Sequence, residues 1–152
     1  MIEIEKSETA DTRSCDFSHV TKELLYVSSI QHINDVKQGM DFFKVLIDEA
    51  VKRHDFDKLT DIDGFYRDFI TGFKTTEWWN NHKKVNRHRL LEQDGIPSDI
   101  NLIDVLDMIV DCIMAGMGRT GKVYPLEITS ELLKTAFDNT VSLLKSQVVV
   151  KP

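Results

Sequence analysis

The sequence predicts an all-α protein, a bundle of about five or six helices. Apolar residues recur at three- and four-residue steps through most of the chain, which is the spacing of one helix face. No convincing strand alternation, internal repeat or low-complexity tract accompanies this pattern. With 152 residues and 41% hydrophobic content, the chain is long enough for one core and short for two. We expect one helical domain over residues 17–147, between a polar N-terminal tail (1–16) and a C-terminal tail (148–152).

Two helices are expected in the first third of the chain. The first covers about residues 18–37, where apolar residues follow the helical spacing. Gly39 interrupts this pattern. A second apolar stripe begins at Met40 and ends near Arg53, which predicts a separate second helix.

The later helices are delimited by glycines, a proline and hydroxyl-bearing capping residues. The segment "DGIPSD" is the strongest break in the chain, and a helix from Asp99 to about Met117 is expected after it. The other expected boundaries are Gly72, Thr75 or Thr76, and Thr129 or Ser130.

Charge and composition restrict the classes of partner. Nineteen basic and 25 acidic residues give a net charge of −6, so polymeric nucleic acid is not expected as a partner. A small phosphorylated ligand is still compatible, because a bound divalent cation can reverse the local charge. The N-terminus lacks the apolar core of a signal peptide, and no stretch approaches the roughly 18 apolar residues that span a bilayer. We therefore expect a cytoplasmic protein with no membrane partner and free thiols at its two cysteines.

One helix, "DINLIDVLDMIVDCIMAG", carries a stripe of acids. Its polar residues between positions 100 and 115 are Asn101, Asp104, Asp107 and Asp111, and they fall within an arc of about 120°. Three acids on one face, with no Lys or Arg among them, repel one another unless water or a cation separates them. The alternative is that the stripe is the narrow solvated face of a nearly buried helix.

Two histidines and another acid can complete a metal site with this stripe. His54 and Asp55 stand side by side in "RHDFDK", where a helical pattern ends, although a helix C-terminus also favours a purely structural pair there. His32, next to apolar positions of the first helix, can equally be a core histidine. Together with Asp104, these residues offer the mixed nitrogen and oxygen set that suits one divalent ion such as Mn, Fe, Co, Ni or Zn, with Mg a further option.

The order H, HD, D on successive helices resembles the HD-domain superfamily of metal-dependent phosphohydrolases, whose last ligand comes from a segment similar to "LIDVLD". More narrowly, "RHDFDK", "NRHRLLE" and "DVLDMIVD" resemble small HD-like proteins of bacteriophages, which typically read "HDxSK" and "N-x-HH". Here Asp57 replaces the serine and Arg89 replaces the second histidine. The resemblance covers about residues 28–117 and implies an HD-domain-like bundle. The metal ligands that it implies are His32, His54, Asp55 and Asp104.

The resemblance also implies an activity, the cleavage of a phosphate ester by attack of a metal-bound water. Nucleotides are the substrate class that it favours. Lys58 is expected to neutralise the substrate phosphate, Asp107 to act as general base or hold a ligand histidine, and His88 to serve as acid or base. Whether His88 or Asp111 also binds the metal is left open. The expected substrate-binding residues are Lys58, Asn86, Arg87 and Arg119.

Two other functions fit the same residues. One is a non-catalytic nucleotide- or protein-binding module on an HD-like scaffold. It is favoured by the missing second histidine and by Lys58, which stands where hydrolases of pyrophosphorylated guanosine nucleotides carry an acid. The other is a helical scaffold without metal, which predicts that the four expected ligands do not converge. The oligomeric state is left open, with a homodimer among the options.

Overall fold

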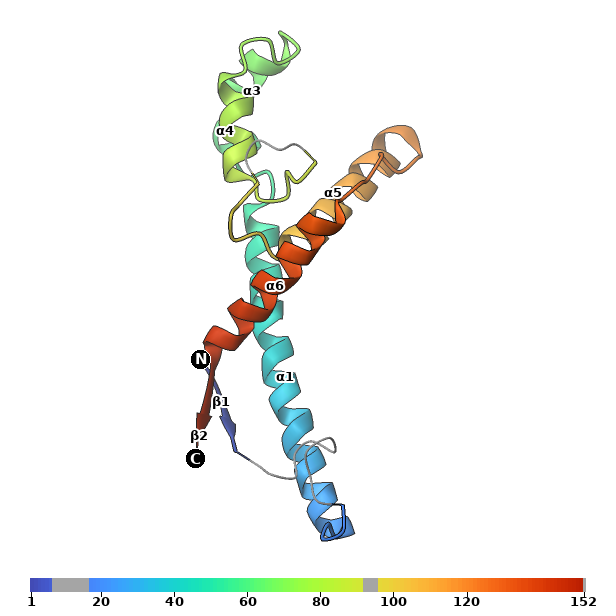
Figure 1. Cartoon of the computed structure of the whole chain (residues 1–152). Helices are drawn as coiled ribbons and strands as arrows, with labels where there is room; N and C mark the ends of the chain where they lie inside the picture. The colour runs from blue at the N-terminus through green and yellow to red at the C-terminus, as the bar shows by residue number, and fades with distance from the viewer. Residues whose placement is uncertain (7–16, 92–95, 152) are drawn as a thin grey trace. The chain divides into compact units, whose positions relative to one another are not determined.

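The computed structural model of the chain describes residues 1–6, 17–91 and 96–151. Within these ranges it contains six helices and two short strands (Figure 1). The prediction of an all-α protein with about five or six helices is confirmed. No helix in the described part combines the length and apolarity needed to cross a bilayer. The elements are β1 (Ile2–Glu5), α1 (Lys22–Arg53), α2 (Asp57–Thr60), α3 (Ile62–Phe69), α4 (Glu77–Val85), α5 (Leu102–Thr120), α6 (Ser130–Gln147) and β2 (Val148–Lys151).

The described chain divides into two compact units. The first unit contains residues 1–45 and 142–152, and the second contains residues 46–141. Helices α1 and α6 each contribute to both units.

A parallel pair of strands lies in the first unit and joins both ends of the chain, where a polar N-terminal tail and a C-terminal tail were expected. Ile2 of β1 lies opposite Val148 of β2, and Glu5 lies opposite Lys151. Figure 1 shows the two strands side by side. The valines of β2 have high strand propensity, but local sequence cannot show that its partner lies at the other end of the chain. The rest of the expected N-terminal tail, residues 7–16, lies outside the described residues.

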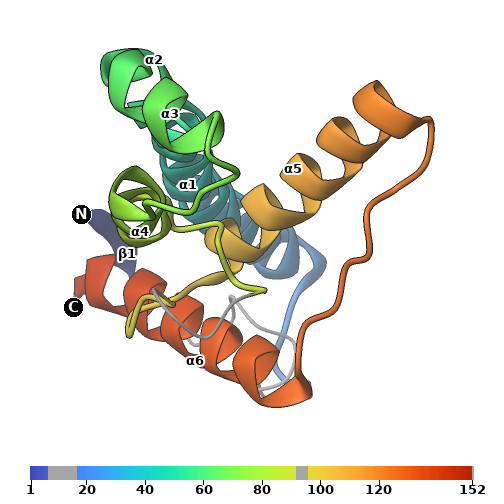
Figure 2. The ribbon, with the colours of Figure 1, turned by 90° about the horizontal axis from the view of Figure 1, so that it is seen from above.

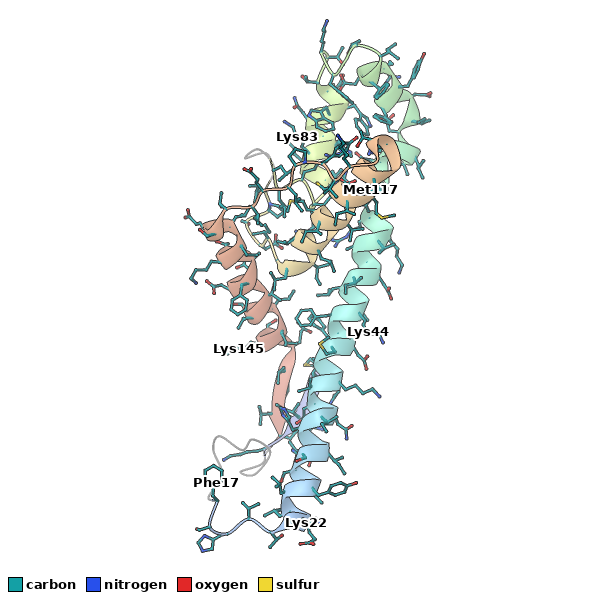
Figure 3. All side chains as sticks on the ribbon, turned by 90° about the vertical axis from the view of Figure 1, so that its right-hand side faces the viewer. Phe17, Lys22, Lys44, Lys83, Met117 and Lys145 are labelled. Carbon is teal, nitrogen blue, oxygen red and sulfur yellow. The ribbon has the colours of Figure 1, made fainter. Side chains whose placement is uncertain are left out.

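Helix α1 is continuous where two helices were expected. Gly39 lies in its interior, and a Cβ at this position would be 3.9 Å from the Leu144 side chain of α6. In Figure 3, Lys22 and Lys44 lie on the same unbroken helix, on either side of Gly39. A single glycine costs a helix about 1 kcal/mol, which is too little to end a helix of 32 residues.

The core of the second unit lies along α5. Two hydrogen bonds fix the start of α5 to α6: the Leu102 N–H donates to Thr140 Oγ1 at 2.9 Å, and Asn139 donates to the Ile100 carbonyl at 2.8 Å. Val105, Met108 and Cys112 of α5 are buried on this side of the helix. The buried core residues are Leu90, Ile100, Val105, Met108, Cys112 and Ala136.

Helices α3 and α4 pack together through aromatic rings, and Figures 1 and 2 both show them as neighbours. The Phe65 ring lies 4.5 Å from the Trp78 ring between centroids, and Trp78 stacks on His82 at 4.6 Å. Trp78 is buried. This packing fixes the end of α4, and with it the start of the segment that carries Asn86 and His88.

The capping residues predicted for α4 and α6 agree with the structure to different degrees. Thr76 precedes α4 with a φ of 56° and makes no side-chain cap. Asp68 caps α4 instead, since its buried carboxylate accepts from the N–H groups of Thr76 at 2.9 Å and Trp79 at 3.0 Å. Thr76 is thus the N-cap residue, as expected, but Asp68 supplies the capping hydrogen bonds. Thr129 does cap α6, because its hydroxyl accepts the Leu132 N–H at 3.1 Å.

Gly116 of α5 is in close contact with the backbone of residues 122–124, which follow the helix. A Cβ at Gly116 would lie 2.5 Å from the Lys122 carbonyl oxygen and 2.6 Å from the Tyr124 nitrogen. We expect Gly116→Ala to lower the free energy of unfolding by about 1–3 kcal/mol, because the clash exceeds the gain in helix propensity. The matched control is Gly118→Ala, in the same helix with no atom within 4 Å of its Cβ, which should be neutral or stabilising by up to about 1 kcal/mol. Urea unfolding followed by circular dichroism measures both, and equal shifts would contradict the close approach at Gly116.

Candidate metal centre

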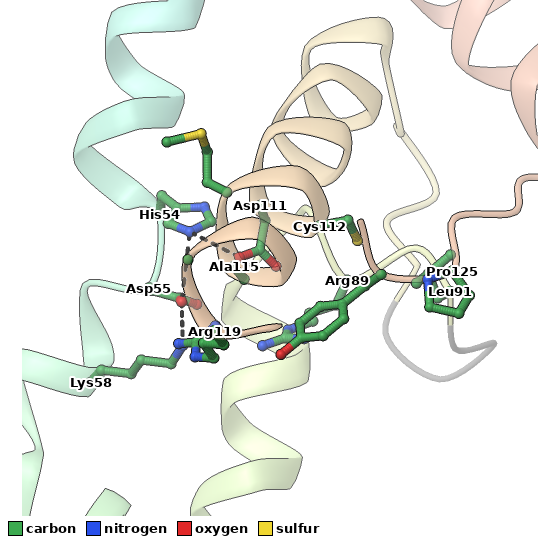
Figure 4. A pocket seen from close by; sticks show the side chains of 13 residues that line it. His54, Asp55, Lys58, Arg89, Leu91, Asp111, Cys112, Ala115, Arg119 and Pro125 are labelled. Carbon is green, nitrogen blue, oxygen red and sulfur yellow. Dashed lines mark hydrogen bonds and ion pairs between the residues drawn. The ribbon is translucent and has the colours of Figure 1, made fainter. Parts of the chain in front are cut away.

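Four side chains from three segments of the second unit converge on one space. His54 and Asp55 follow the end of α1, and Asp111 lies on α5 (Figure 4). His88 follows α4. His54 Nε2 lies 3.6 Å from Asp55 Oδ2 and 3.7 Å from Asp111 Oδ1. His88 Nε2 lies 3.6 Å from Asp55 Oδ1 and 3.8 Å from Asp111 Oδ2. We call these four residues the four-ligand cluster.

The spacing and burial of the cluster fit a divalent metal ion. Metal bonds of about 2.0–2.2 Å to nitrogen and oxygen place neighbouring ligand atoms about 3.0–3.6 Å apart, close to the observed distances. His54, Asp55 and His88 offer ligand atoms that all lie within 4.8 Å of one another. Asp55 Oδ1 and His88 Nε2 are buried and have no hydrogen-bond partner among the described residues. Buried polar atoms are rarely left unpaired, and one cation would satisfy both.

Asp107 lies on the Nδ1 side of both imidazoles of the cluster and is hydrogen-bonded to that of His54. Its Oδ1 lies 2.8 Å from His54 Nδ1, and its Oδ2 lies 3.6 Å from His88 Nδ1. With Asp107 on the Nδ1 side, the Nε2 lone pairs of both rings face the shared space. The rings are stacked, with centroids 4.3 Å apart. Burial alone would raise the pKa of Asp107, but the two imidazoles outweigh it and lower that pKa, so Asp107 is ionised at neutral pH.

Asp55 is held in an unusual backbone conformation. Its φ is 52°, in the left-handed region that a non-glycine residue adopts at a cost of about 1–2 kcal/mol. Its N–H donates to Asn86 Oδ1 at 2.8 Å. Asn86 is 2% exposed and donates in turn to Asp57 Oδ1 at 2.9 Å. The buried Asp57 carboxylate also lies 2.9 Å from His82 Nδ1, so a hydrogen-bonded network supports the backbone of Asp55.

The side chain of Asp55 is held as well as its backbone. Lys58 donates a hydrogen bond to Asp55 Oδ2. Burial alone would raise the pKa of Asp55, but Lys58 and the nearby imidazoles outweigh it and lower that pKa. Asp55 is thus in the ionised form that a metal ligand requires.

A cavity of about 650 Å³ adjoins the cluster and combines cations with an apolar wall (Figure 4). His54, Asp55 and Asp111 open onto it from the cluster. Its cationic side chains are Lys58, Arg89 and Arg119, and its apolar and aromatic ones include Leu91, Met114, Tyr124 and Pro125.

His32 does not belong to the cluster, although the sequence suggested it as a ligand. It is exposed and lies on α1 in the first unit, whereas the four residues of the cluster belong to the second unit.

Asp104 and Arg87 pair with each other instead of serving metal and substrate. Arg87 donates to the Asp104 carboxylate through Nε at 2.7 Å and Nη2 at 2.8 Å. Asp104 also accepts the Asn101 N–H at 3.0 Å, which completes the capping box of α5. This pairing raises the pKa of Arg87, which also bonds to Asp99 at 3.0 Å. Asp111, two turns further along α5, is the residue of the acidic stripe that lies beside His54 and His88.

The other expected site residues lie at or next to the cluster. Lys58 and Arg119 line the cavity, as a phosphate-binding role requires. His88, expected as an acid or base, is 2% exposed and sits at a ligand position. Asn86, expected to contact substrate, is buried in the network behind Asp55. Asp107 is hydrogen-bonded to His54 and lies 3.6 Å from His88 Nδ1, next to the cluster.

Three further residues of the site were not expected from sequence: Asp57, His82 and Arg89. His82 and Asn86 are four residues apart, so they share one face of α4 and its continuation, and this spacing was the available signal. Their contact with Asp57 joins segments far apart in sequence, which local patterns do not reveal.

Comparisons with known proteins found no protein similar to this chain. No protein-family model matches the chain, and no curated protein or solved structure matches it either. The resemblance to the HD-domain superfamily therefore remains a prediction from the motifs, and the function of the centre is inferred from its own geometry.

Proposed function

We propose that the protein is a metal-dependent phosphohydrolase of HD-domain type that cleaves a phosphate ester, with nucleotides as the substrate class. The observation that carries this proposal is the shared space between the Nε2 atoms of His54 and His88 and the carboxylates of Asp55 and Asp111. Two imidazoles and two carboxylates suit Mn, Fe, Co, Ni or Zn better than an all-oxygen site would. These four residues would hold one such ion.

The chain's own residues supply positioning and charge for the reaction. A divalent ion in this centre would polarise a phosphoryl oxygen and lower the pKa of a water molecule. Lys58 and Arg119 face the same cavity and would neutralise the substrate phosphate. Asp107 is hydrogen-bonded to the His54 imidazole and lies on the Nδ1 side of both rings.

A second candidate function is a non-catalytic module that binds a nucleotide or a protein. It is favoured by the hydrogen bond from Lys58 to Asp55 Oδ2, the carboxylate oxygen nearest His54 Nε2. A lysine at this position partly neutralises the cluster without a metal and competes with an ion for Asp55. A nucleotide bound without turnover would distinguish this module from the hydrolase.

Metal analysis combined with a substrate panel tests the proposal. We expect about one divalent metal ion per chain by mass spectrometry of the purified protein. Phosphate release from nucleoside mono-, di- and triphosphates should stop with EDTA and return with Mn²⁺, because the ion is needed to activate water. Metal or nucleotide binding without any phosphate release would support the binding module instead. A protein that binds no divalent metal would contradict the hydrolase.

A further inference from the structure

Arg89 lines the cavity beside the four-ligand cluster and is held there by a buried histidine. Arg89 Nη2 lies 3.0 Å from His82 Nε2, and His82 Nδ1 lies 2.9 Å from the Asp57 carboxylate. Because Asp57 takes the Nδ1 proton of His82, the Nε2 lone pair is free to accept from Arg89.

An aromatic ring provides a second support for Arg89. The guanidinium carbon lies 5.0 Å from the centroid of the Trp79 ring, within the range of a cation–π contact. Trp79 is itself stacked on His82, with centroids 5.3 Å apart. The guanidinium is therefore fixed from two sides by uncharged groups.

The charge of Arg89 is not neutralised within the described part of the chain. Arg87 pairs with Asp104 and Asp99, and Lys58 pairs with Asp55. Among the described residues, no carboxylate lies within ion-pair distance of Arg89, and its buried Nε has no hydrogen-bond partner. A partly buried guanidinium that is held rigidly but not neutralised retains both its charge and unused N–H donors.

We propose that Arg89 is the oxyanion-binding residue of this cavity, and that Asp57, His82 and Trp79 hold its guanidinium in place. A guanidinium presents paired N–H donors that match two oxygens of a phosphate group. The proposal rests on the proposed function only in identifying that oxyanion as the substrate phosphate. Asp57 then has two tasks, since it steadies Arg89 through His82 and the backbone of Asp55 through Asn86.

Binding of inorganic phosphate to the full-length protein tests the role of Arg89. Titrations are made by calorimetry with saturating Mn²⁺ and again with EDTA. The fluorescence of Trp78 and Trp79 gives a second readout, since the Trp79 ring lies next to the guanidinium. We expect Arg89→Gln to raise the phosphate Kd at least about tenfold, because charge-assisted hydrogen bonds are lost. Arg89→Lys should raise it less, since lysine keeps the charge but not the paired donors. The matched control is Lys84→Gln, an exposed lysine outside the cavity, which should change the Kd by less than about twofold.

The outcomes separate this inference from the proposed hydrolase. If Arg89→Gln folds poorly by circular dichroism, Arg89→Lys carries the test alone. A phosphate Kd that is unchanged in the folded Arg89 variants would overturn the inference and leave metal-dependent hydrolysis intact. Arg89-dependent phosphate binding in EDTA, in a protein that binds no Mn²⁺, would support the inference while contradicting the hydrolase.

Discussion

Replacing His88 by alanine is expected to weaken Mn²⁺ binding by more than about 100-fold and to abolish phosphate release. Residues that only support metal ligands already contribute about 10- to 100-fold to affinity, and His88 is placed as a ligand itself. Its Nε2 is buried, faces Asp55 and Asp111 at 3.6 Å and 3.8 Å, and has no hydrogen-bond partner among the described residues. Calorimetric titration with Mn²⁺, together with phosphate release from a nucleotide, measures the effect.

The matched control for this variant is His32→Ala. His32 is the histidine that the sequence motif suggested as a ligand, yet it is exposed on α1 in the first unit. We expect its replacement to leave both Mn²⁺ affinity and phosphate release unchanged. Loss of metal binding in His32→Ala, with retention in His88→Ala, would restore the ligand set suggested by the motif and contradict the four-ligand cluster.

Asn86→Ala is expected to weaken Mn²⁺ binding by about 10- to 100-fold, although Asn86 does not belong to the cluster. Asn86 accepts the N–H of Asp55 at 2.8 Å and donates to Asp57 at 2.9 Å. Without it, the left-handed backbone of Asp55 loses its support and the Asp57 carboxylate loses a donor. We also expect the free energy of unfolding to fall by about 1–3 kcal/mol, because buried polar groups are left unpaired.

The effect of Asn86→Ala on affinity separates positioning from general stability. Asn81→Ala, at an exposed position of α4, should leave Mn²⁺ affinity and unfolding free energy within experimental scatter of the wild type. Calorimetry and urea unfolding are measured on all three proteins. If Asn86→Ala lost stability while its Mn²⁺ affinity stayed that of the wild type, Asn86 would be a core residue and not a positioning residue for Asp55.

Helical periodicity predicted the fold class, because each helix buries an apolar stripe that local sequence displays. It did not predict the parallel pairing of β1 with β2, whose strands come from opposite ends of the chain. It also gave too much weight to Gly39. A glycine that lowers local propensity by about 1 kcal/mol does not break a helix that is stabilised elsewhere.

At the candidate site, the sequence predicted which kinds of residue come together better than it predicted which individual residues contact one another. His54, Asp55 and the acidic stripe were expected to share a site, and the structure brings His54, Asp55 and Asp111 together. Asp104 was misassigned because its spacing from Asn101 is also that of a capping box, a local signal that competes with the motif. The network of Asp57 and His82 depends on a contact between two distant segments, so no local pattern contained it.

The most direct measurement of the central claim is the position of a metal ion in crystals of the protein grown with Mn²⁺. Anomalous diffraction near the manganese absorption edge locates the ion independently of any activity. We predict one anomalous peak about 2.0–2.3 Å from His54 Nε2 and His88 Nε2 and from carboxylate oxygens of Asp55 and Asp111. A peak on other residues, or no peak at this centre under saturating Mn²⁺, would contradict the account.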